Sequence, residues 1–228
     1  MNNTEWIEKF EPIAYQYYKS QIGKKQFDDI QVRTTKKLLV SELESLLVNK
    51  PYRILDIGAG PITTLGNILS DGSTIEIIAI DPLAKCYNKL LQEYNYSTPV
   101  QTVFGLGEWI DVQFNGLRFD IVYSHNAIDH ACNCPDKIFT NAAKILKPNG
   151  SIYFEFYEDE GERSSYKEMH QWNFYLDGND LILWGKTIFK NNQINITNLL
   201  RTEGCAQFKH EILPKQMIRF IATKGAKK

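Results

Sequence analysis

The sequence predicts an α/β protein whose central sheet has seven strands, mostly parallel and doubly wound, with an antiparallel hairpin at its C-terminal end and a helical cap at its N-terminal end. Two observations lead to this class. Between residues 52 and 157, short apolar runs alternate with segments of helical period, as in successive βαβ units. After residue 205, two strand patterns follow each other with only "PK" between them, which leaves no room for a helix and predicts a hairpin.

Composition and charge describe an ordinary globular chain. Hydrophobic residues make up 43% of the 228 residues and the formal net charge is −1, so no global basic field would attract nucleic acid. The N-terminus lacks the pattern of a signal peptide, and no apolar run reaches the length of about 18 residues that a membrane span needs. We therefore expect a cytoplasmic protein with reduced thiols. Cys132 and Cys134 form a C-x-C without a second pair, so no zinc site is predicted.

The first fifty residues show helical periodicity. Thr4 is the expected N-cap of a helix over "TEWIEKFEPIAYQYYKSQIG". Its apolar residues recur at three- and four-residue steps, at Trp6, Phe10, Ile13 and Tyr17. The segment "TTKKLLVSELESLLVNK" repeats the pattern at Leu39, Leu43, Leu46 and Leu47, and Pro51 ends it. Residues 1–50 are thus expected to form the helical cap.

The next hundred residues supply the strands and helices of the predicted sheet. The expected strands are "RILDIG", "IEIIAID", "VQTVFG", "FDIVYSH" and "SIYFEFYE", and the expected helices are "PITTLGNILSDG", "LAKCYNKLLQEY" and "PDKIFTNAAKIL". The closing hairpin pairs "AQFKHEIL" with "QMIRFIATK". Between the strand "SIYFEFYE" and this hairpin, the aromatic-rich residues 170–196 predict one or two further hairpins, with turns at "DGND" and "KNNQ". Right-handed crossovers would leave a crevice at the carboxyl ends of the parallel strands.

A glycine loop at the first strand indicates which ligand this crevice holds. Gly58 and Gly60 follow a strand that contains Asp56, in "LDIGAGPITT". The loop lacks the G-x-x-x-x-G-K-[ST] of a triphosphate site, and Thr63 replaces the last glycine of a dinucleotide fingerprint. Asp56 would repel a pyrophosphate but suits a cationic group such as an ammonium. Asp81, at the end of the second strand, suits ribose hydroxyls. S-adenosylmethionine has both a cationic ammonium and a ribose.

Structural alternatives exist for each of these residues. Asp56 could cap the following helix, and Asp81 could be the N-cap before a helix that begins with Pro82. Glu108 could be a solvated surface acid, and the glycines could form only a tight turn. The order of the motifs along the chain favours the binding interpretation.

The motifs resemble those of the class I S-adenosylmethionine-dependent methyltransferases. "ILDIGAGP", "IAID", "GLGEW", "FDIVYSH" and "HNAIDHACNCPDKIFTNAAKILKPNG" stand in the family's order from Tyr52 to Tyr157. The resemblance implies a Rossmann-like fold and these roles: Asp56, Gly58 and Gly60 around the methionine moiety, Asp81 on the ribose, Leu106, Gly107 and Glu108 beside the adenine, and His125 beside the sulfonium. Two positions depart from the family, since Pro61 replaces a third glycine and Leu106 a common acid.

The resemblance also implies a reaction, namely methyl transfer to an oxygen or nitrogen of a small polar metabolite, with a sugar or sugar-linked group as one candidate. His130 is the first candidate for the base, and His170 and Asp129 are the others. "NAIDH" is similar to a run in metal-assisted quinone O-methyltransferases, but Asn126 replaces one acid and no metal is predicted. The alternatives are a nicotinamide-dependent oxidoreductase and a catalytically silent binding subunit.

The expected organisation is a single domain over residues 1–228. It consists of the cap (1–50), a cofactor-binding half (52–157), a substrate-side insertion (158–200) and the closing hairpin (201–228). The insertion would cover the acceptor, with Gln171 and Asn173 recognising hydroxyl groups. Its aromatic residues either stack on the acceptor or form a small core; these are Tyr157, Tyr166, Trp172, Phe174, Tyr175 and Trp184. The expected partner is a small-molecule acceptor, with no nucleic acid and no membrane, and the oligomeric state stays open.

Overall fold

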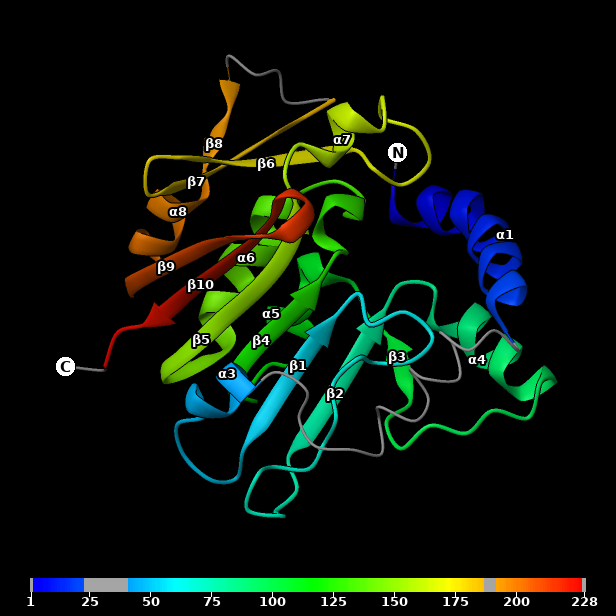
Figure 1. The fold of residues 1–228 in the computed structure, drawn as a ribbon, viewed down its shortest axis with the longest axis horizontal. Helices are drawn as coiled ribbons and strands as arrows, with labels where there is room; N and C mark the ends of the chain where they lie inside the picture. Colours follow the sequence, from blue (N-terminus) through cyan, green and yellow to red (C-terminus); the bar gives the residue numbers. More distant parts are fainter. Residues whose placement is uncertain (1, 23–40, 187–191, 227–228) are drawn as a thin grey trace.

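The computed structural model describes residues 2–22, 41–186 and 192–226. Seven strands form the central sheet in the order β3-β2-β1-β4-β5-β10-β9 (Figure 1). Their bounds are β1 Arg53–Ile57, β2 Glu76–Asp81, β3 Thr102–Phe104, β4 Phe119–His125, β5 Leu146–Tyr157, β9 Cys205–Leu213 and β10 Met217–Lys224. The first five strands pair in parallel, and β10 is antiparallel to both β5 and β9. The predicted α/β sheet and its closing hairpin are confirmed.

Two apolar clusters cover the two faces of the sheet. Leu55 of β1 and Val122 of β4 belong to one cluster, whereas their chain neighbours Ile54 and Ile121 belong to the other. This alternation follows from the two-residue period of a strand. It explains why β1 and β4 read as continuous apolar runs, since these central strands are buried on both sides.

The helices have these bounds in the described residues: α1 Asn3–Gln21, α3 Ser41–Ser45, α4 Ala84–Glu93, η1 Gly107–Trp109, α5 Ile110–Gln113, η2 Ile128–His130, α6 Pro135–Ile145, α7 Glu160–Arg163, α8 Ile196–Thr202 and η4 Pro214–Gln216. The predicted helices over 83–94 and 135–146 correspond to α4 and α6. Of the second predicted helix of the cap, the structure describes α3 and the residues after it, while Leu39 lies outside the described residues. No helix in the described ranges combines the length and apolarity needed to cross a membrane.

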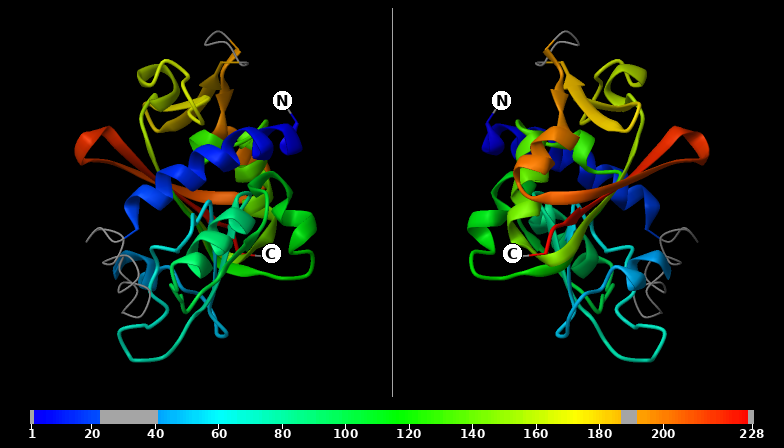
Figure 2. Two further views of the ribbon diagram at one scale, coloured as in Figure 1. Left: turned by 90° about the vertical axis from the view of Figure 1, so that its right-hand side faces the viewer. Right: turned by 90° about the vertical axis from the view of Figure 1, so that its left-hand side faces the viewer.

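Helix α1 packs beside α4 at the end of the sheet (Figures 1 and 2). Its N-cap is Asn2 rather than the expected Thr4: the Asn2 side chain accepts a hydrogen bond from the Glu5 backbone, and the Glu5 carboxylate accepts one from the Asn2 backbone. This reciprocal pair satisfies two free N–H groups of the first turn, which explains why the helix begins earlier. The predicted apolar stripe divides, because Ala14 is buried while Ile13 and Tyr17 are exposed.

The helix predicted over 61–72 is wrong, because these residues form turns and an isolated bridge between Ile68 and Thr74. The side chain of Thr63 donates to the carboxylate of Asp56 and accepts from the Leu65 backbone. Such side-chain bonds offer the backbone an alternative to the helical ladder, and two glycines weaken the helix further. The possible role of Asp56 as a helix cap therefore does not apply.

The insertion forms a separate three-stranded antiparallel sheet of β6 Trp172–Asp177, β7 Asp180–Gly185 and β8 Ile194–Asn195. The predicted turn at "DGND" is confirmed, because Asp177 pairs with Asp180 across it. The expected turn at "KNNQ" lies partly outside the described residues. Helices α7 and α8 flank this sheet and were not foreseen, since each is short and has little periodicity.

Candidate active site

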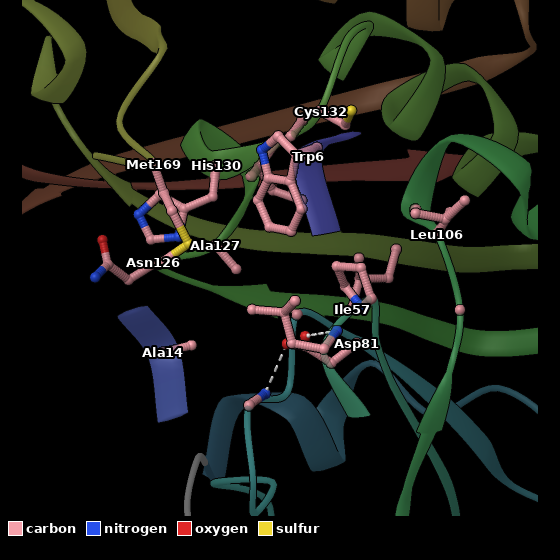
Figure 3. Close-up of a pocket in the computed structure, with 18 of the residues that line it drawn as sticks. Trp6, Ala14, Ile57, Asp81, Leu106, Asn126, Ala127, His130, Cys132 and Met169 are labelled. Atoms are coloured by element: carbon pink, nitrogen blue, oxygen red, sulfur yellow. Dashed lines mark hydrogen bonds between the residues drawn. The ribbon is translucent and has the colours of Figure 1, made fainter. Parts of the chain in front are cut away.

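A cavity of about 520 Å³ lies at the carboxyl ends of β1, β2 and β4. Its volume is within the range of roughly 300–1,000 Å³ that is usual for small-molecule sites. Helix α1, the glycine loop, the end of β2, η1, the turn after β4 and residues 168–170 of the insertion line it (Figure 3). The crevice expected from the topology is therefore present, and the cap and the insertion both contribute walls.

The two glycines of the loop let the backbone reach the cavity. Gly58 and Gly60 have φ angles of +71° and +64°, which glycine adopts without strain. A β-carbon on Gly58 would lie 2.3 Å from the side chain of Ala127, and one on Gly60 would lie 3.2 Å from the hydroxyl of Tyr18. Both glycines are thus required by conformation and by close approach. Their contact with a cofactor remains a prediction.

Asp81 ends β2 and lines the cavity. Its carboxylate accepts hydrogen bonds from the backbone N–H groups of Gly60 at 3.1 Å and Leu83 at 2.8 Å. Burial raises the pKa of Asp81 to about 6, against the lowering effect of these two bonds. The N-cap of α4 is Leu83, so Asp81 is not a helix cap and is free to meet a ligand from the cavity.

Asp56 lies beside an adjoining hollow of about 230 Å³ rather than in the main cavity. Both spaces are lined by Tyr18, Gly58, Gly60 and Asn126. Burial raises the pKa of Asp56 to about 7, although the hydrogen bond from Thr63 and the nearby His125 oppose the shift. A cation in this hollow would restore the ionised carboxylate, as the sequence argument requires.

Leu106, Gly107 and Glu108 all line the far end of the cavity. Glu108 is 8% exposed, so its interpretation as a solvated surface acid is wrong. Its carboxylate accepts the backbone N–H of Cys132 at 3.1 Å, and burial raises its pKa. Glu108 therefore joins the loop after β3 to the loop before α6.

His125, expected beside the sulfonium, ends β4 and lines the smaller hollow. Its Nδ1 lies 2.8 Å from Glu155, and Glu155 also accepts a hydrogen bond from Arg219 at 2.8 Å. Burial alone would raise the pKa of Glu155, but His125 and Arg219 together outweigh burial and lower it. His125 thus stands at the edge of the hollow, oriented by a carboxylate.

The three candidate catalytic residues form one cluster. Asp129 is fully buried, and its Oδ2 lies 2.7 Å from Nδ1 of His170 and 3.3 Å from Nε2 of His130. Burial lowers the pKa of His130 despite the attraction of Asp129, whereas the bond to Asp129 raises the pKa of His170. No local sequence pattern predicts the contact between His130 and His170, which lies forty residues further along the chain. The insertion brings it there.

This cluster also has the composition of a metal site. The ligand atoms of Asp129, His130 and His170 lie within 4.8 Å of one another. A carboxylate with two imidazoles suits a transition metal better than magnesium or calcium. The expectation of no metal remains a prediction.

The polar residues expected to recognise the acceptor lie away from the cavity. Asn173 is fully buried, where it accepts from the Glu162 backbone and donates to the hydroxyl of Tyr166. The amide of Gln171 donates to backbone carbonyls of the insertion. Trp172, Phe174 and Trp184 are buried, and the first two belong to an apolar cluster of the central sheet, so these side chains form core rather than a stacking surface.

Other residues that line the cavity were not assigned to the site from the sequence. Tyr18 and Trp6 of α1 reach it because of how the cap docks, and Met169 reaches it from the insertion (Figure 3). Asn126 follows β4 with a φ of +51°, a left-handed conformation that Asn adopts more readily than most residues. Among these residues, only Asn126 could have been assigned to the cavity from the sequence, because it directly follows the predicted fourth strand.

These features define an α/β protein with a ligand cavity at the ends of its parallel strands. Residues 54–150 match the family model described as a methyltransferase domain. This match bears out the resemblance of the motifs to the class I S-adenosylmethionine-dependent methyltransferases over residues 54–150. No curated protein matches the chain.

Solved structures share the fold at low sequence identity. The putative methyltransferase from Haloferax volcanii, in complex with the Trm112 methyltransferase activator, has a TM-score of 0.53 at 15% identity, over 97% of this chain and 98% of that one. A protein from Pyrococcus horikoshii OT3 has a TM-score of 0.51 at 15% identity, over 89% and 93%. The citrinin polyketide synthase CMeT domain has 0.54 at 16% identity, over 82% of this chain and 50% of that one. An O-methyltransferase family protein from Burkholderia thailandensis has a TM-score of 0.47 at 12% identity, and this chain covers 59% of it while 99% of this chain is matched.

Proposed function

We propose that this protein transfers a methyl group from S-adenosylmethionine to an oxygen or nitrogen of a small molecule. One observation carries the proposal: a single cavity is lined by Gly58, Gly60 and Asp81 on one side and by His130 and His170 on the other. Methyl transfer needs such proximity, because alignment of acceptor and donor supplies much of the rate. The cofactor provides the activated methyl group, and the protein provides position and proton transfer.

The cofactor residues follow from the family roles and from their place around the cavity. In this proposal Asp81 holds the ribose hydroxyls, and Leu106, Gly107 and Glu108 lie at the adenine end. Asp56, Gly58 and Gly60 surround the methionine end, and His125 stands near the sulfonium. The smaller hollow supports this assignment, because it places the buried Asp56 where a cationic ammonium would be stabilised.

His130 is the proposed base. Its lowered pKa keeps the imidazole neutral near pH 7, so one ring nitrogen is available to take a proton. Its Nε2 is directed at Asp129 and His170, which leaves Nδ1 for the acceptor. The carboxylate of Asp129 would stabilise the imidazolium that forms. His170 acts through Asp129, holding that carboxylate in place.

The acceptor is a small molecule in this proposal, and residues 158–200 provide its wall through Glu168, Met169 and His170. The more specific expectation of a sugar loses its support, since Gln171, Asn173 and the aromatic residues named for the insertion do not line the cavity. A wall made by an insertion rather than by the sheet fits a role in choosing the acceptor.

Calorimetry with S-adenosylmethionine and NAD tests the proposal. We expect saturable binding of S-adenosylmethionine and none of NAD, followed by formation of S-adenosylhomocysteine when an acceptor is supplied from a screen with labelled cofactor. Binding of NAD instead would identify an oxidoreductase. Binding of S-adenosylmethionine without turnover of any acceptor would identify a silent binding subunit.

A further inference from the structure

The wall of the cavity contributed by α1 has an apolar surface that no described residue covers. Ile13 and Tyr17 line the cavity, yet they are 41% and 58% exposed. They are four residues apart on one helix, so their side chains lie on the same side. Uncovered apolar side chains at the rim of a cavity are expected where a ligand with an apolar body covers them.

The insertion extends this apolar wall to the proposed base. Met169 lines the same cavity and packs against the cluster of α1 residues that contains Trp6. Figure 3 places Met169 and His130 together at one end of the cavity, with the ring of Trp6 between them and Leu106. An acceptor beside His130 would therefore contact Met169, and its body would extend along α1.

Apart from the histidines, the titratable side chains that carry charge at the cavity are all acids. Asp81, Glu108 and Glu168 line it, and no lysine or arginine among the described residues lines either the cavity or the adjoining hollow. An acceptor with a carboxylate or phosphate would meet these acids without a fixed cation as partner. Like charges in such a site raise the free energy of the complex, so they select against anionic ligands.

We infer that the acceptor has an apolar body, is neutral or cationic, and presents a hydroxyl or amino group to His130. This inference rests on the proposed function and specifies its substrate class. It excludes acceptors whose body is polar, such as sugars, and acceptors that carry a carboxylate or phosphate.

Three probes that share one ring and differ in charge test the inference. They are 4-ethylphenol, tyramine and 4-hydroxyphenylacetate, and glucosamine is the polar control. Each is titrated by calorimetry into the protein saturated with S-adenosylhomocysteine. We expect 4-ethylphenol and tyramine to bind, 4-hydroxyphenylacetate to bind at least about tenfold more weakly because of the like charges, and glucosamine not to bind.

Two variants locate the effect on the wall described above. Ile13→Ser should weaken binding of 4-ethylphenol by about three- to tenfold, because apolar contact is lost. The matched control is Ile212→Ser on β9, where the side chain is 60% exposed and lines neither space. Glu168→Gln should reduce the difference in affinity between tyramine and 4-hydroxyphenylacetate.

The titration of S-adenosylhomocysteine separates this inference from the proposed function. If S-adenosylhomocysteine does not bind, both are overturned. If it binds, but glucosamine or 4-hydroxyphenylacetate binds as well as 4-ethylphenol, only the inference on the acceptor is overturned. Equal effects of Ile13→Ser and Ile212→Ser would also overturn it.

Discussion

The two sides of the cavity are built in different ways. On the cofactor side, Gly58, Gly60 and Asp81 stand at the ends of adjacent parallel strands, and Gly60 donates directly to Asp81. On the acceptor side, the turn after β4 meets α1 and the insertion, which are distant in the sequence. The bond between His170 and Asp129 spans forty-one residues and joins two of these segments.

The pKa values of the carboxyl groups on the two sides are shifted in opposite directions. Burial raises the pKa of Asp56 and Asp81 to about 7 and about 6. Asp129 is buried as well, but the two neighbouring histidines outweigh burial and lower its pKa. The cofactor side therefore favours a ligand that brings positive charge or hydrogen-bond donors, while the acceptor side already has its own charge partners.

Replacing the proposed base should give the largest effect and should leave the cofactor side intact. His130→Ala is expected to lower kcat by roughly 10²–10⁴, because the acceptor proton has no group to receive it. Affinity for S-adenosylmethionine, measured by calorimetry, should not change. In the unaltered protein kcat should rise with pH through the pKa of His130, which lies below the usual value of 6.5.

His170→Ala is the comparison for the base. It leaves the ring of His130 in place, so kcat should fall less than in His130→Ala and the pH at half-maximal rate should move. A near-normal kcat in both variants would show that neither histidine is the base and that alignment alone drives the reaction.

At Gly58 the loop after β1 contacts the turn after β4, because the absence of a side chain on Gly58 leaves space for Ala127. Gly58→Ala should lower the free energy of unfolding by about 2–4 kcal/mol, from the clash at 2.3 Å and the positive φ together. It should also weaken binding of S-adenosylmethionine. Denaturant unfolding and calorimetry measure the two effects.

The control for this clash is Gly72→Ala. Gly72 also has a positive φ, +83°, but a β-carbon there would meet no atom within 4 Å. It should therefore lose only about 1 kcal/mol of stability and no cofactor affinity. Equal losses in the two variants would contradict the role given to Ala127.

Asp81→Ala tests the cofactor side alone. Each bond from a ribose hydroxyl to this carboxylate should contribute about 1.5–3 kcal/mol, so affinity for S-adenosylmethionine should fall tenfold or more. Circular dichroism must show that the variant is folded, since Asp81 also accepts the Gly60 N–H. Unchanged affinity in a folded variant would remove Asp81 from the site.

The smallest expected effect concerns pH and Asp56. Its pKa in the folded protein, about 7, exceeds the ordinary 3.8, so between these values the folded state binds more protons than the unfolded state. Stability should therefore fall as pH rises from about 4 to 7. Asp56→Asn should remove this fall, a difference on the order of 1 kcal/mol between pH 6 and 8.

Asp71→Asn is the control for the pH effect: the Ser73 hydroxyl and N–H lower the pKa of Asp71, so its contribution to stability changes only below about pH 4, and the fall at higher pH should remain in this variant. Denaturant titrations at each pH measure both variants. The same pH dependence in the wild type and in Asp56→Asn would show that Asp56 is ionised in the folded protein without a ligand.

The sequence by itself determined the parallel sheet, the closing hairpin and the loop residues that we propose for the cofactor. These depend on short-range signals, since strands buried on both faces read as apolar runs and parallel strands end at one edge. Gly58, Gly60 and Asp81 could be found because each stands at the end of such a strand or within three residues of it. The helix over 61–72 failed because Thr63 bonds to Asp56, a contact that periodicity does not reveal.

The tertiary structure alone decided the acceptor side. Whether Ile13 joins the core or faces the cavity depends on how α1 docks against α4, and its helical spacing fits both. The pairing of His170 with Asp129 requires the insertion to fold back over the turn after β4. Neither contact has a local signature, because each is fixed by packing between segments that lie far apart in the chain.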